Sequence, residues 1–281
     1  MEIFVINLKH STDRLKQYDA NMKRLGLSYT RWDATYGKDV EFTPGNSTLA
    51  CRKILCNNGI VGCYTSHVRL WKHIVKHYTE GWFLIMEDDA LLTDKAIPGI
   101  NAIFKDLEHW KSNSPYPEMI NIGCQGMCKF KKVTNNLYEN PLVHGTGAYL
   151  VSFDACKKLI KLLDVPIVTH IDLTLSIKQL IAKNLGYYAS HQNYIRLQST
   201  ESTISAGSFP KLIYWIFSYI GRLFELNNTL FESCSLNFKS LCVNILIVVF
   251  VIVIALLLKY KLYIPAAAYI LLEIAVYKWI K

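Results

Sequence analysis

The stretch WFLIMEDDALLT, residues 82–93, runs from a continuous apolar segment directly into three consecutive carboxylates. A short unbroken apolar segment is typical of a strand that is buried on both faces of a sheet. In open α/β sheets, ligands bind at the carboxyl ends of the strands. The stretch therefore predicts an α/β fold in which Glu87, Asp88 and Asp89 lie at the ligand-binding edge of the sheet.

Residues 1–205 repeat this pattern, because short apolar runs alternate with segments of helical periodicity. Alternating strands and helices are typical of a mostly parallel sheet that is covered on both faces. The segment 38–58 has no clear period and is predicted to be a loop. The expected strands are residues 3–8, 28–35, 82–86, 119–123 and 147–152, and the expected helices are residues 12–25, 66–78 and 153–163.

The composition is that of a packed protein, since 51% of the 281 residues are apolar and 19% are charged. The formal net charge of +9 suggests an anionic partner such as a nucleic acid, a membrane surface or a phosphorylated substrate, although basic residues also keep a surface solvated. No helix-turn-helix, RNA-recognition or zinc-finger pattern occurs. The sequence therefore does not indicate nucleic-acid binding.

The chain has eight cysteines, and the spacing between Cys124 and Cys128 is not a strong zinc signature. The first residues lack the basic region and the apolar length of a secretory signal. Disulfides form in oxidising compartments. We therefore expect the cysteines to be mostly reduced and buried.

The residues after position 205 differ in kind from the α/β part. Residues 241–258 are a stretch of 18 residues without a charge, near the lower limit for crossing about 30 Å of hydrocarbon. A second apolar stretch, 262–280, includes Glu273, which is costly in lipid unless it is paired or neutral. The tail is predicted to be either a transmembrane hairpin or a tail anchor followed by an interfacial helix.

Three regions are therefore expected: an α/β domain at 1–205, an amphipathic connecting region at 206–240 and a membrane anchor at 241–281. The aromatic segment 209–226 either lies in the membrane interface or packs on the α/β domain. The apolar tail predicts that the protein is located at a membrane. Because no secretory signal is recognised, we expect the α/β domain on the cytosolic side.

The acidic triplet has the chemistry of a cation site. Alternate side chains of an extended strand share a face, so Glu87 and Asp89 are expected to point together and Asp88 away from them. Two carboxylates on one face suit Mn²⁺ or Mg²⁺, whose shells are completed by water and substrate phosphates. Glu87 and Asp89 are therefore the predicted metal ligands, and the alternative is a solvated acidic turn.

Four segments of the α/β part occur in an order that is shared with one known family. They are FVINLKHSTDR (4–14), RWDATYGKDV (31–40), GIVGCYTSHVRLWKHI (59–74) and LIMEDDALL (84–92). They resemble, in turn, the opening strand, the Ala-x-x-Gly stretch, the Gly-Cys-x-x-Ser-His-x-x-x-Trp block and the Leu-Glu-Asp-Asp motif of glycosyltransferase family 25. This family includes bacterial lipooligosaccharide galactosyltransferases and collagen hydroxylysine galactosyltransferases. The resemblance covers about residues 3–205 and leaves out the apolar tail.

The resemblance implies a GT-A fold, a single Rossmann-like α/β domain that binds a nucleotide-sugar. It also implies an inverting glycosyltransferase that moves a hexose, galactose or glucose, from a UDP-sugar to a glycan, lipid-linked or protein hydroxyl acceptor, with Mn²⁺ at the acidic motif. The contrasting hypothesis is a glycosyltransferase-like domain without turnover that serves as a membrane scaffold or a sugar-binding module. The intact triplet favours the enzyme, because an inactive site has no reason to keep mutually repelling charges.

Inversion needs a base that takes the proton of the acceptor. Asp172 is the first candidate and His170 the alternative, although Asp172 could instead be the N-cap of the helix that follows it. A structural role is the alternative for His67, and Trp71 is expected in the core. The residues expected to contact the nucleotide-sugar are Asn7, Arg14, Ser66, His67, Asp88, Gly145 and Ser202.

Overall fold

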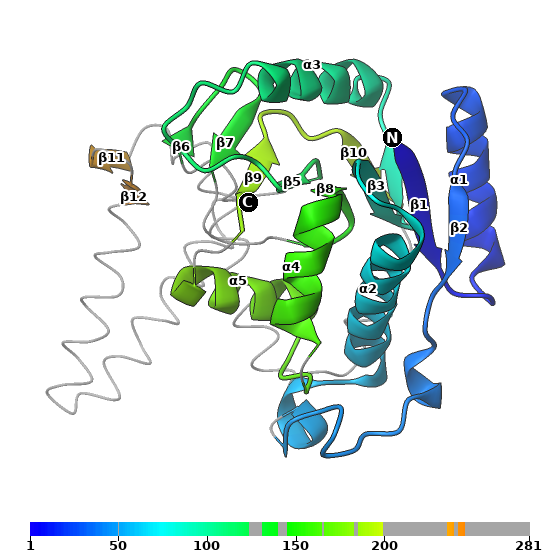
Figure 1. Cartoon of the computed structure of the whole chain (residues 1–281). Coiled ribbons are helices and arrows are strands. Elements are labelled where there is room, and N and C mark those ends of the chain that lie inside the picture. The colour runs from blue at the N-terminus through cyan, green and yellow to red at the C-terminus, as the bar shows by residue number, and fades with distance from the viewer. Residues whose placement is uncertain are drawn as a thin grey trace, which may run out of the picture. The chain divides into compact units, whose positions relative to one another are not determined.

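The computed structural model divides the chain into two compact units, Met1–Phe224 and Glu225–Lys281. The first unit contains an α/β domain (Figure 1), as the alternating sequence pattern predicts. The residues that the structure describes are 1–49, 51–123, 131–139, 145–164, 166–182 and 185–198, together with the strands Ser235–Phe238 and Leu241–Asn244.

An eight-stranded sheet forms the centre of the first unit, with the strand order β2-β1-β3-β8-β5-β9-β7-β6. The sheet is mostly parallel, because β1, β2, β3, β5, β6 and β9 run in one direction and only β7 and β8 run in the other. Its strands are β1 (Glu2–Asn7), β2 (Thr30–Asp33), β3 (Trp82–Glu87), β5 (Met119–Asn121), β6 (Lys131–Lys132), β7 (Leu137–Glu139), β8 (Ala148–Ser152) and β9 (Tyr187–Ser190). A separate antiparallel pair is formed by β4 (Ala90–Leu92) and β10 (Ile195–Leu197).

Helices cover both faces of the sheet and bury alternate side chains of its strands. Phe4 of β1 and Ile85 of β3 lie in a core cluster that they share with α2, α4 and α5. Their neighbours Val5 and Leu84 lie in a second cluster that they share with α1 and α3. Burial of each such side chain contributes about 1.5–3 kcal/mol, so burial on both faces explains the unbroken apolar run of β3. The helices are α1 (Thr12–Arg24), α2 (Asn58–His77), α3 (Ala96–Glu108), α4 (Phe153–Leu163) and α5 (Ile171–Ala182), with a 3-10 turn η1 (Gly37–Asp39) and a π-helical turn η2 (Cys51–Leu55).

The helix that was expected at residues 66–78 begins earlier, at Asn58. Its N-cap is Asn57, whose side-chain oxygen accepts a hydrogen bond from the Ile60 N–H at 2.8 Å. Glycine has low helix propensity, and Gly59 and Gly62 interrupt the apolar period in the first turns. The sequence pattern therefore did not predict a helix there. Helix α3 was not expected at all. Its Pro98 lies in the first turn, where proline is tolerated although it interrupts the pattern.

Two cysteines form a disulfide, Cys51–Cys56, so the expectation of mostly reduced cysteines is wrong for this pair. Turn η2 brings their Cα atoms to 4.7 Å, within the range that a disulfide spans. Cys63 and Cys156 are free thiols, and Cys156 is buried as expected.

The described residues near the C-terminus form an antiparallel hairpin of β11 (Ser235–Phe238) and β12 (Leu241–Asn244). The expected membrane helix from residue 241 is therefore wrong for Leu241–Asn244, whose backbone pairs with β11 instead. Within the part of the chain that the structure describes, no helix is both long and apolar enough to span a bilayer. The rest of the expected anchor and the aromatic segment 209–226 lie outside the described residues.

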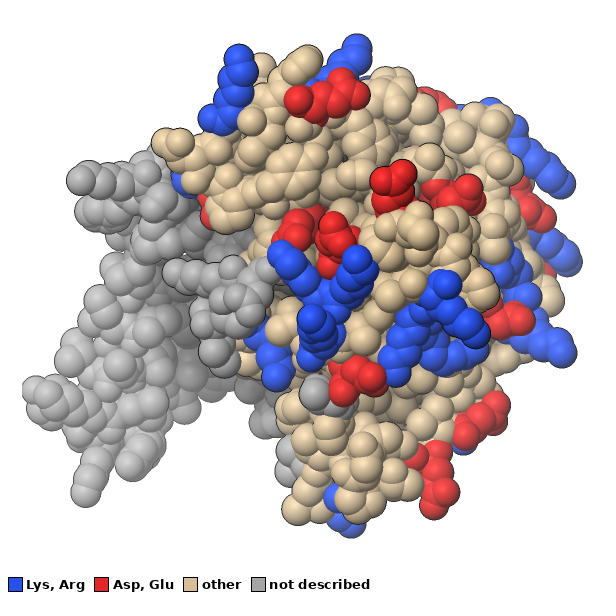
Figure 2. Space-filling view, viewed as in Figure 1, with Lys and Arg blue, Asp and Glu red and all other residues tan. Residues whose placement is uncertain are grey.

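The outer face of α2 and α4 is basic but of mixed sign. Figure 2 shows Lys and Arg side chains gathered on the viewed face, with Asp and Glu side chains beside them. Ion pairs such as Lys72 with Asp164 at 2.9 Å and Lys157 with Asp154 at 3.0 Å offset part of this charge. The exposed lysines of the two helices are Lys72, Lys76, Lys157, Lys158 and Lys161.

The loop between β2 and α2 approaches the helix so closely that only glycine fits. A Cβ atom on Gly37 would lie 1.6 Å from the carbonyl oxygen of Asn58, and one on Gly62 would lie 2.7 Å from the carbonyl oxygen of Thr35. Both obstacles are backbone atoms, which cannot rotate away. This contact fixes the loop against the first turns of α2.

We expect Gly37→Ala to destabilise the domain by about 1–3 kcal/mol, the usual cost of overpacking. Urea unfolding followed by circular dichroism measures the change. The matched control is Gly45→Ala, because a Cβ atom there would come no closer than 3.7 Å to Thr43 Oγ1. Equal stability of the two variants would contradict the proposed close contact.

Candidate active site

The acidic triplet lies at the carboxyl end of β3, held by backbone bonds to both neighbouring strands. The Glu87 N–H donates to the carbonyl oxygen of Gly147 at 2.8 Å, just before β8. The Asp88 N–H donates to the carbonyl oxygen of Ile6 in β1 at 3.1 Å. Because β8 runs antiparallel to β3, the residues that precede β8 reach this same edge of the sheet.

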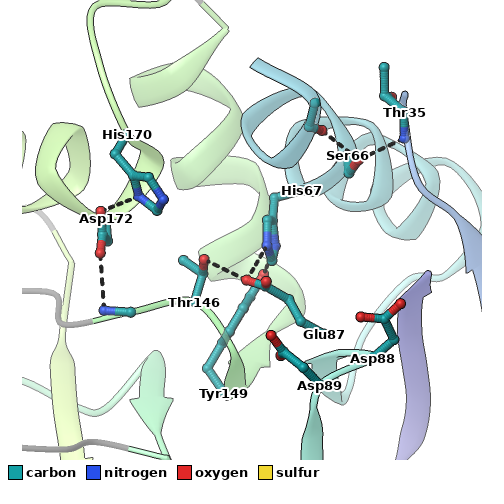
Figure 3. Close-up of polar contacts among 12 residues, drawn as sticks. Thr35, Ser66, His67, Glu87, Asp88, Asp89, Thr146, Tyr149, His170 and Asp172 are labelled. Carbon is teal, nitrogen blue, oxygen red and sulfur yellow. Dashed lines mark hydrogen bonds and ion pairs between the residues drawn. The ribbon is translucent and has the colours of Figure 1, made fainter. Parts of the chain in front are cut away.

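Glu87 faces His67 and Thr146 (Figure 3). Its Oε1 accepts a hydrogen bond from Thr146 Oγ1 at 3.1 Å and lies 3.5 Å from His67 Nε2. Burial alone would raise the pKa of Glu87, but the contact with His67, followed by the charge of His170 and the hydrogen bond from Thr146, outweighs burial and lowers it. Glu87 is therefore ionised in the folded protein.

Asp88 is buried, and both of its oxygens have partners. Oδ2 accepts from Asn7 Nδ2 at 2.7 Å, and Oδ1 accepts from Arg14 at 3.2 Å. Arg31 Nε in turn donates to Asn7 Oδ1 at 2.8 Å and fixes the amide. Burial raises the pKa of Asp88, and Asn7 and Arg14 partly oppose this rise. Asp88 thus ties the acidic turn to β1 and α1.

Asp89 has little compensation for its charge. Arg14 lies 3.9 Å from its carboxylate, beyond hydrogen-bond distance. Burial, followed by the charges of Glu87 and Asp88, raises the pKa of Asp89 to about 6. The Gln198 N–H donates to the Asp89 carbonyl oxygen at 2.8 Å, which holds the backbone and leaves the carboxylate available. Figure 3 shows Glu87 and Asp89 next to each other, with Asp88 turned to the other side.

His170 and Asp172 form a hydrogen-bonded pair across from Glu87 (Figure 3). Asp172 Oδ1 contacts His170 Nδ1 and also accepts from the Leu173 N–H at 2.7 Å, while Oδ2 accepts from the Gly145 N–H at 3.3 Å. Gly145 has φ +72°, a conformation that favours glycine. Asp172 lies inside the first turn of α5, so it is not the N-cap of that helix.

The contact between His170 and Asp172 shifts the pKa of both groups. Burial raises the pKa of Asp172, but the bonds from His170, Leu173 and Gly145 lower it overall. Burial lowers the pKa of His170, but Asp172 and then Glu87 outweigh burial and raise it. In the folded protein the carboxylate is therefore the weaker base of the two.

A cavity of about 530 Å³ opens beside the triplet. It lies between the end of β1, the loop from β2 to η1, and the first turns of α2. His10 and Tyr36 form an edge-to-face pair at 4.9 Å on its wall, and Lys38 lies 5.8 Å from the Tyr36 ring. The lining residues that matter for ligand chemistry are His10, Arg14, Tyr36, Lys38, Asn58 and Glu87.

A helix N-terminus and cations at the same cavity favour an anionic ligand. The first turn of α2 points backbone N–H groups and the positive end of the helix dipole at this space, because Asn58 and Gly59 line it. Arg14 and Lys38 add positive charge. Glu87 and Asp88 add negative charge, and Arg14 lies 3.2 Å from the Asp88 carboxylate. The cavity therefore suits a ligand that carries phosphates and can share a cation with carboxylates.

The family model for glycosyltransferase family 25 (LPS biosynthesis protein) matches residues 1–175 of the chain. The chain belongs to glycosyltransferase family 25. Procollagen galactosyltransferases 1-A and 1-B of Xenopus laevis are each 26% identical over 174 residues, which cover 57% of this chain and 28% of theirs. Procollagen galactosyltransferase 2 of Mus musculus is also 26% identical, with 57% of this chain and 27% of its own covered. The chain thus spans little more than a quarter of the length of these curated relatives.

Two solved structures are also similar in part. A197 from STIV is 9% identical with a TM-score of 0.36, covering 72% of this chain and 97% of its own. A glycosyltransferase involved in glycosylation of the major capsid of PBCV-1 is 15% identical with a TM-score of 0.28, covering 57% of this chain and 65% of its own.

The structure brings most of the residues expected from the family 25 motifs to one edge of the sheet. Ser66 is used within the fold, since its hydroxyl accepts from the Thr35 N–H at 2.8 Å and donates to the Gly62 carbonyl oxygen at 2.6 Å. Trp71 is buried, as expected. Ser202 lies outside the described residues. The residues that lie at the site or its cavity are Asn7, Arg14, Ser66, His67, Glu87, Asp88, Asp89, Gly145, His170 and Asp172.

Sequence reasoning missed the cavity wall formed by His10, Tyr36 and Lys38, and also the buried hydroxyl of Tyr149. Tyr36 and Lys38 flank Gly37 in the segment that resembles the family's Ala-x-x-Gly stretch, which was a usable signal. Tyr149 lies in an ordinary strand pattern, so no signal in the sequence distinguishes it.

The donor set fits a hard divalent cation of the kind that family 25 implies. Asp89 carries a carboxylate with a raised pKa, and such an uncompensated charge is stabilised by a cation. Glu87 is its ionised neighbour. Among the described residues, donor atoms of Cys63, His67 and Glu87 also lie within 4.8 Å of one another. Burial raises the pKa of the Cys63 thiol well above its ordinary value, which favours the neutral thiol over a ligating thiolate.

The raised pKa of Asp89 predicts a pH-dependent stability for the metal-free protein. Above pH 6 the folded state must ionise a carboxyl group that ionises near pH 4 in the unfolded chain, so Asp89 destabilises the fold there. We expect Asp89→Asn to be more stable than the wild type at pH 7.5, by on the order of 1 kcal/mol, with the difference vanishing towards pH 4.

Urea unfolding in EDTA across this pH range measures the difference. Glu80→Gln, which removes an exposed carboxylate outside the site, is the control and should show no such trend. A wild type that is more stable than Asp89→Asn at pH 7.5 would mean that a protein group already compensates the charge.

Proposed function

We propose that this chain is an inverting, metal-dependent glycosyltransferase that transfers galactose or glucose from a UDP-sugar to a hydroxyl group. The acceptor is a glycan, a lipid-linked sugar or a protein side chain. The observation that carries the proposal is the meeting of an incompletely compensated acidic turn with a cavity that Arg14, Lys38 and the first turn of α2 line, at one edge of the sheet. The galactosyltransferase names of the relatives support the donor class.

The cavity supports a binding mode for a nucleoside diphosphate. The first turn of α2 and Lys38 offer donors and positive charge to the phosphates. The edge-to-face pair of His10 and Tyr36 offers apolar ring surface to the nucleobase. Asn7 and Arg14 act less directly, because they hold Asp88 in place.

Asp89 and Glu87 are the residues proposed to hold Mn²⁺ or Mg²⁺. When bound, the cation would neutralise negative charge that develops on the departing diphosphate. Arg14, 3.9 Å from Asp89, adds positive charge on the same side. The protein thus concentrates charge compensation where the sugar–phosphate bond breaks.

The contacts of Asp172 favour His170 as the base, which reverses the first assignment from the sequence. Asp172 accepts bonds from His170, Leu173 and Gly145, which lower its pKa and occupy its oxygens. His170 uses Nδ1 for Asp172, so Nε2 is the atom proposed to take the proton. The acceptor hydroxyl loses its proton to Nε2 as its oxygen bonds to the anomeric carbon, and the diphosphate leaves with the electron pair of the broken bond.

The membrane association of the protein also belongs to this proposal. The apolar residues 245–281 support an anchor, with the α/β domain on the cytosolic side. Protease digestion of sealed membrane vesicles tests this arrangement. We expect the α/β domain to be protected in vesicles whose cytosolic face is inside and to be digested in vesicles whose cytosolic face is outside.

Thermal unfolding with UDP and Mn²⁺, followed by transfer assays with a panel of UDP-sugars, tests the proposed activity. A ligand present at 100 times its Kd stabilises the folded state by about 2.7 kcal/mol. We expect stabilisation that needs both ligands and that is lost in Asp89→Asn. Stabilisation without hydrolysis or transfer would instead support the inactive sugar-binding module.

Substitutions at the proposed base give a further prediction. We expect His170→Gln to lower kcat by about 10²–10⁴-fold, the usual contribution of a general base. Asp172→Asn should lower kcat less and shift the acidic limb of the pH profile to lower pH, because Asp172 raises the pKa of His170. Steady-state rates between pH 5 and 9 measure both effects. An inactive Asp172→Asn beside a nearly normal His170→Gln would restore Asp172 as the base.

A further inference from the structure

A line of buried polar side chains connects helix α2 and strand β8 to Glu87. Trp71, His67 and Tyr149 are all inaccessible to solvent. Tyr149 Oη lies 3.0 Å from Trp71 Nε1 and 2.9 Å from His67 Nδ1. His67 Nε2 lies 3.5 Å from Glu87 Oε1, and Figure 3 shows the side chains of Tyr149 and Glu87 both extending toward the His67 ring.

The direction of each hydrogen bond follows from the donors that are available. An indole nitrogen can only donate, so Tyr149 Oη accepts from Trp71. The hydroxyl proton of Tyr149 then needs an acceptor, and among the residues that the structure describes His67 Nδ1 is the one within reach. A neutral imidazole whose Nδ1 accepts carries its proton on Nε2. His67 is therefore fixed as the Nε2–H tautomer.

This tautomer presents a donor to one oxygen of Glu87. Oε1 accepts a hydrogen bond from the Thr146 hydroxyl at 3.1 Å, and His67 Nε2 lies 3.5 Å from the same oxygen, in contact with it but outside hydrogen-bond geometry. Among the described residues, none donates a hydrogen bond to Oε2. The carboxylate is thereby held by one oxygen, and the other is left for a ligand.

The same tautomer decides between two uses of the Cys63, His67 and Glu87 cluster. Donor atoms within 4.8 Å of one another would also suit a soft cation such as Zn²⁺. Coordination would require a lone pair on His67 Nε2, since Nδ1 is engaged by Tyr149. A metal at Nε2 would have to move that proton to Nδ1 and break the hydrogen bond that Tyr149 donates, so this arrangement favours orienting Glu87 over binding a metal through His67.

We propose that Trp71, Tyr149 and His67 are positioning residues that fix the orientation of Glu87 through a single histidine tautomer. Their effect on turnover rests on the proposed function, in which Glu87 holds the cation. The tautomer itself does not depend on that function, so the two can fail separately.

Nitrogen NMR of the full chain with ¹⁵N-labelled histidine tests the tautomer directly. We expect His67 to show a protonated Nε2 and an unprotonated Nδ1 in the wild type, and to lose this preference in Tyr149→Phe. A protonated Nδ1, or an unchanged pattern in Tyr149→Phe, would overturn the inference. A thiolate-to-metal absorption band on adding Co²⁺ alone would overturn it as well, because it would establish a Cys63 metal site.

Two substitutions of His67 test the positioning role. In His67→Gln, the side-chain amide nitrogen takes nearly the place of His67 Nε2 and can donate to Glu87. In His67→Asn, the side-chain amide nitrogen takes the place of Nδ1 and cannot reach Glu87. We expect His67→Gln to keep the KM for Mn²⁺ within about threefold of the wild type and His67→Asn to raise it by about 10–100-fold, the usual effect of losing a group that orients a metal ligand. Circular dichroism verifies that both variants are folded.

The control pair is His77→Gln and His77→Asn at the exposed end of the same helix, which should leave the KM for Mn²⁺ unchanged. Equal KM values for His67→Gln and His67→Asn would overturn the positioning role. If the wild type itself shows no Mn²⁺-dependent transfer, the proposed function fails, and the NMR pattern still decides the tautomer.

Discussion

The constraint on which the site depends is the concentration of three carboxylates at the end of one buried strand. Two like charges about 5 Å apart repel by about 3 kcal/mol at an effective dielectric constant of 20. The protein compensates the three groups unequally: Asp88 has an amide and a guanidinium, Glu87 has a histidine and a hydroxyl, and Asp89 has a distant arginine. Because the compensation is unequal, the turn keeps a negative charge at Asp89 that a bound cation would stabilise.

Much of the surrounding structure serves that arrangement. Arg31 fixes Asn7, and Gln198 bonds through its amide to the Asp88 carbonyl oxygen at 2.8 Å. These groups come from β2, β1 and the end of β10, which are distant in sequence. Asp88 therefore ties the acidic turn to the fold through hydrogen bonds, while Glu87 lines the cavity.

The sequence predicted those features that depend on local pattern. Strand β3 was predicted because its apolar run is short and unbroken, helix α4 because its apolar residues have a helical period, and the triplet because its charge is concentrated. The start of α2 was missed because Gly59 and Gly62 hide it. The proposal of His170 in place of Asp172 as the base depends on hydrogen bonds that no local pattern contains, such as the one that Gly145 of another segment donates to Asp172.

Other features could not be predicted because they exist only after folding. The contact between His67 and Tyr149 joins residues 82 positions apart, and neither local sequence pattern predicts it. The Cys51–Cys56 disulfide depends on a π-helical turn inside a segment that has no period. Leu241–Asn244 forms a strand that pairs with Ser235–Phe238, and local apolarity carries no information about such pairing.

The reversed direction of β8 has a consequence for how such a site can change. Strands β1 and β3 bring Asn7 and Glu87 to the site with their carboxyl ends, whereas the segment that enters β8 brings Thr146 and Gly147 at the amino end of that strand. The two halves of the site therefore lie on strands that run in opposite directions and meet at one edge of the sheet. Mutations that lengthen or recompose the segment entering β8 can alter this part of the site while the groups on β1 and β3 keep their geometry, which under the proposed function leaves room for new acceptor specificities.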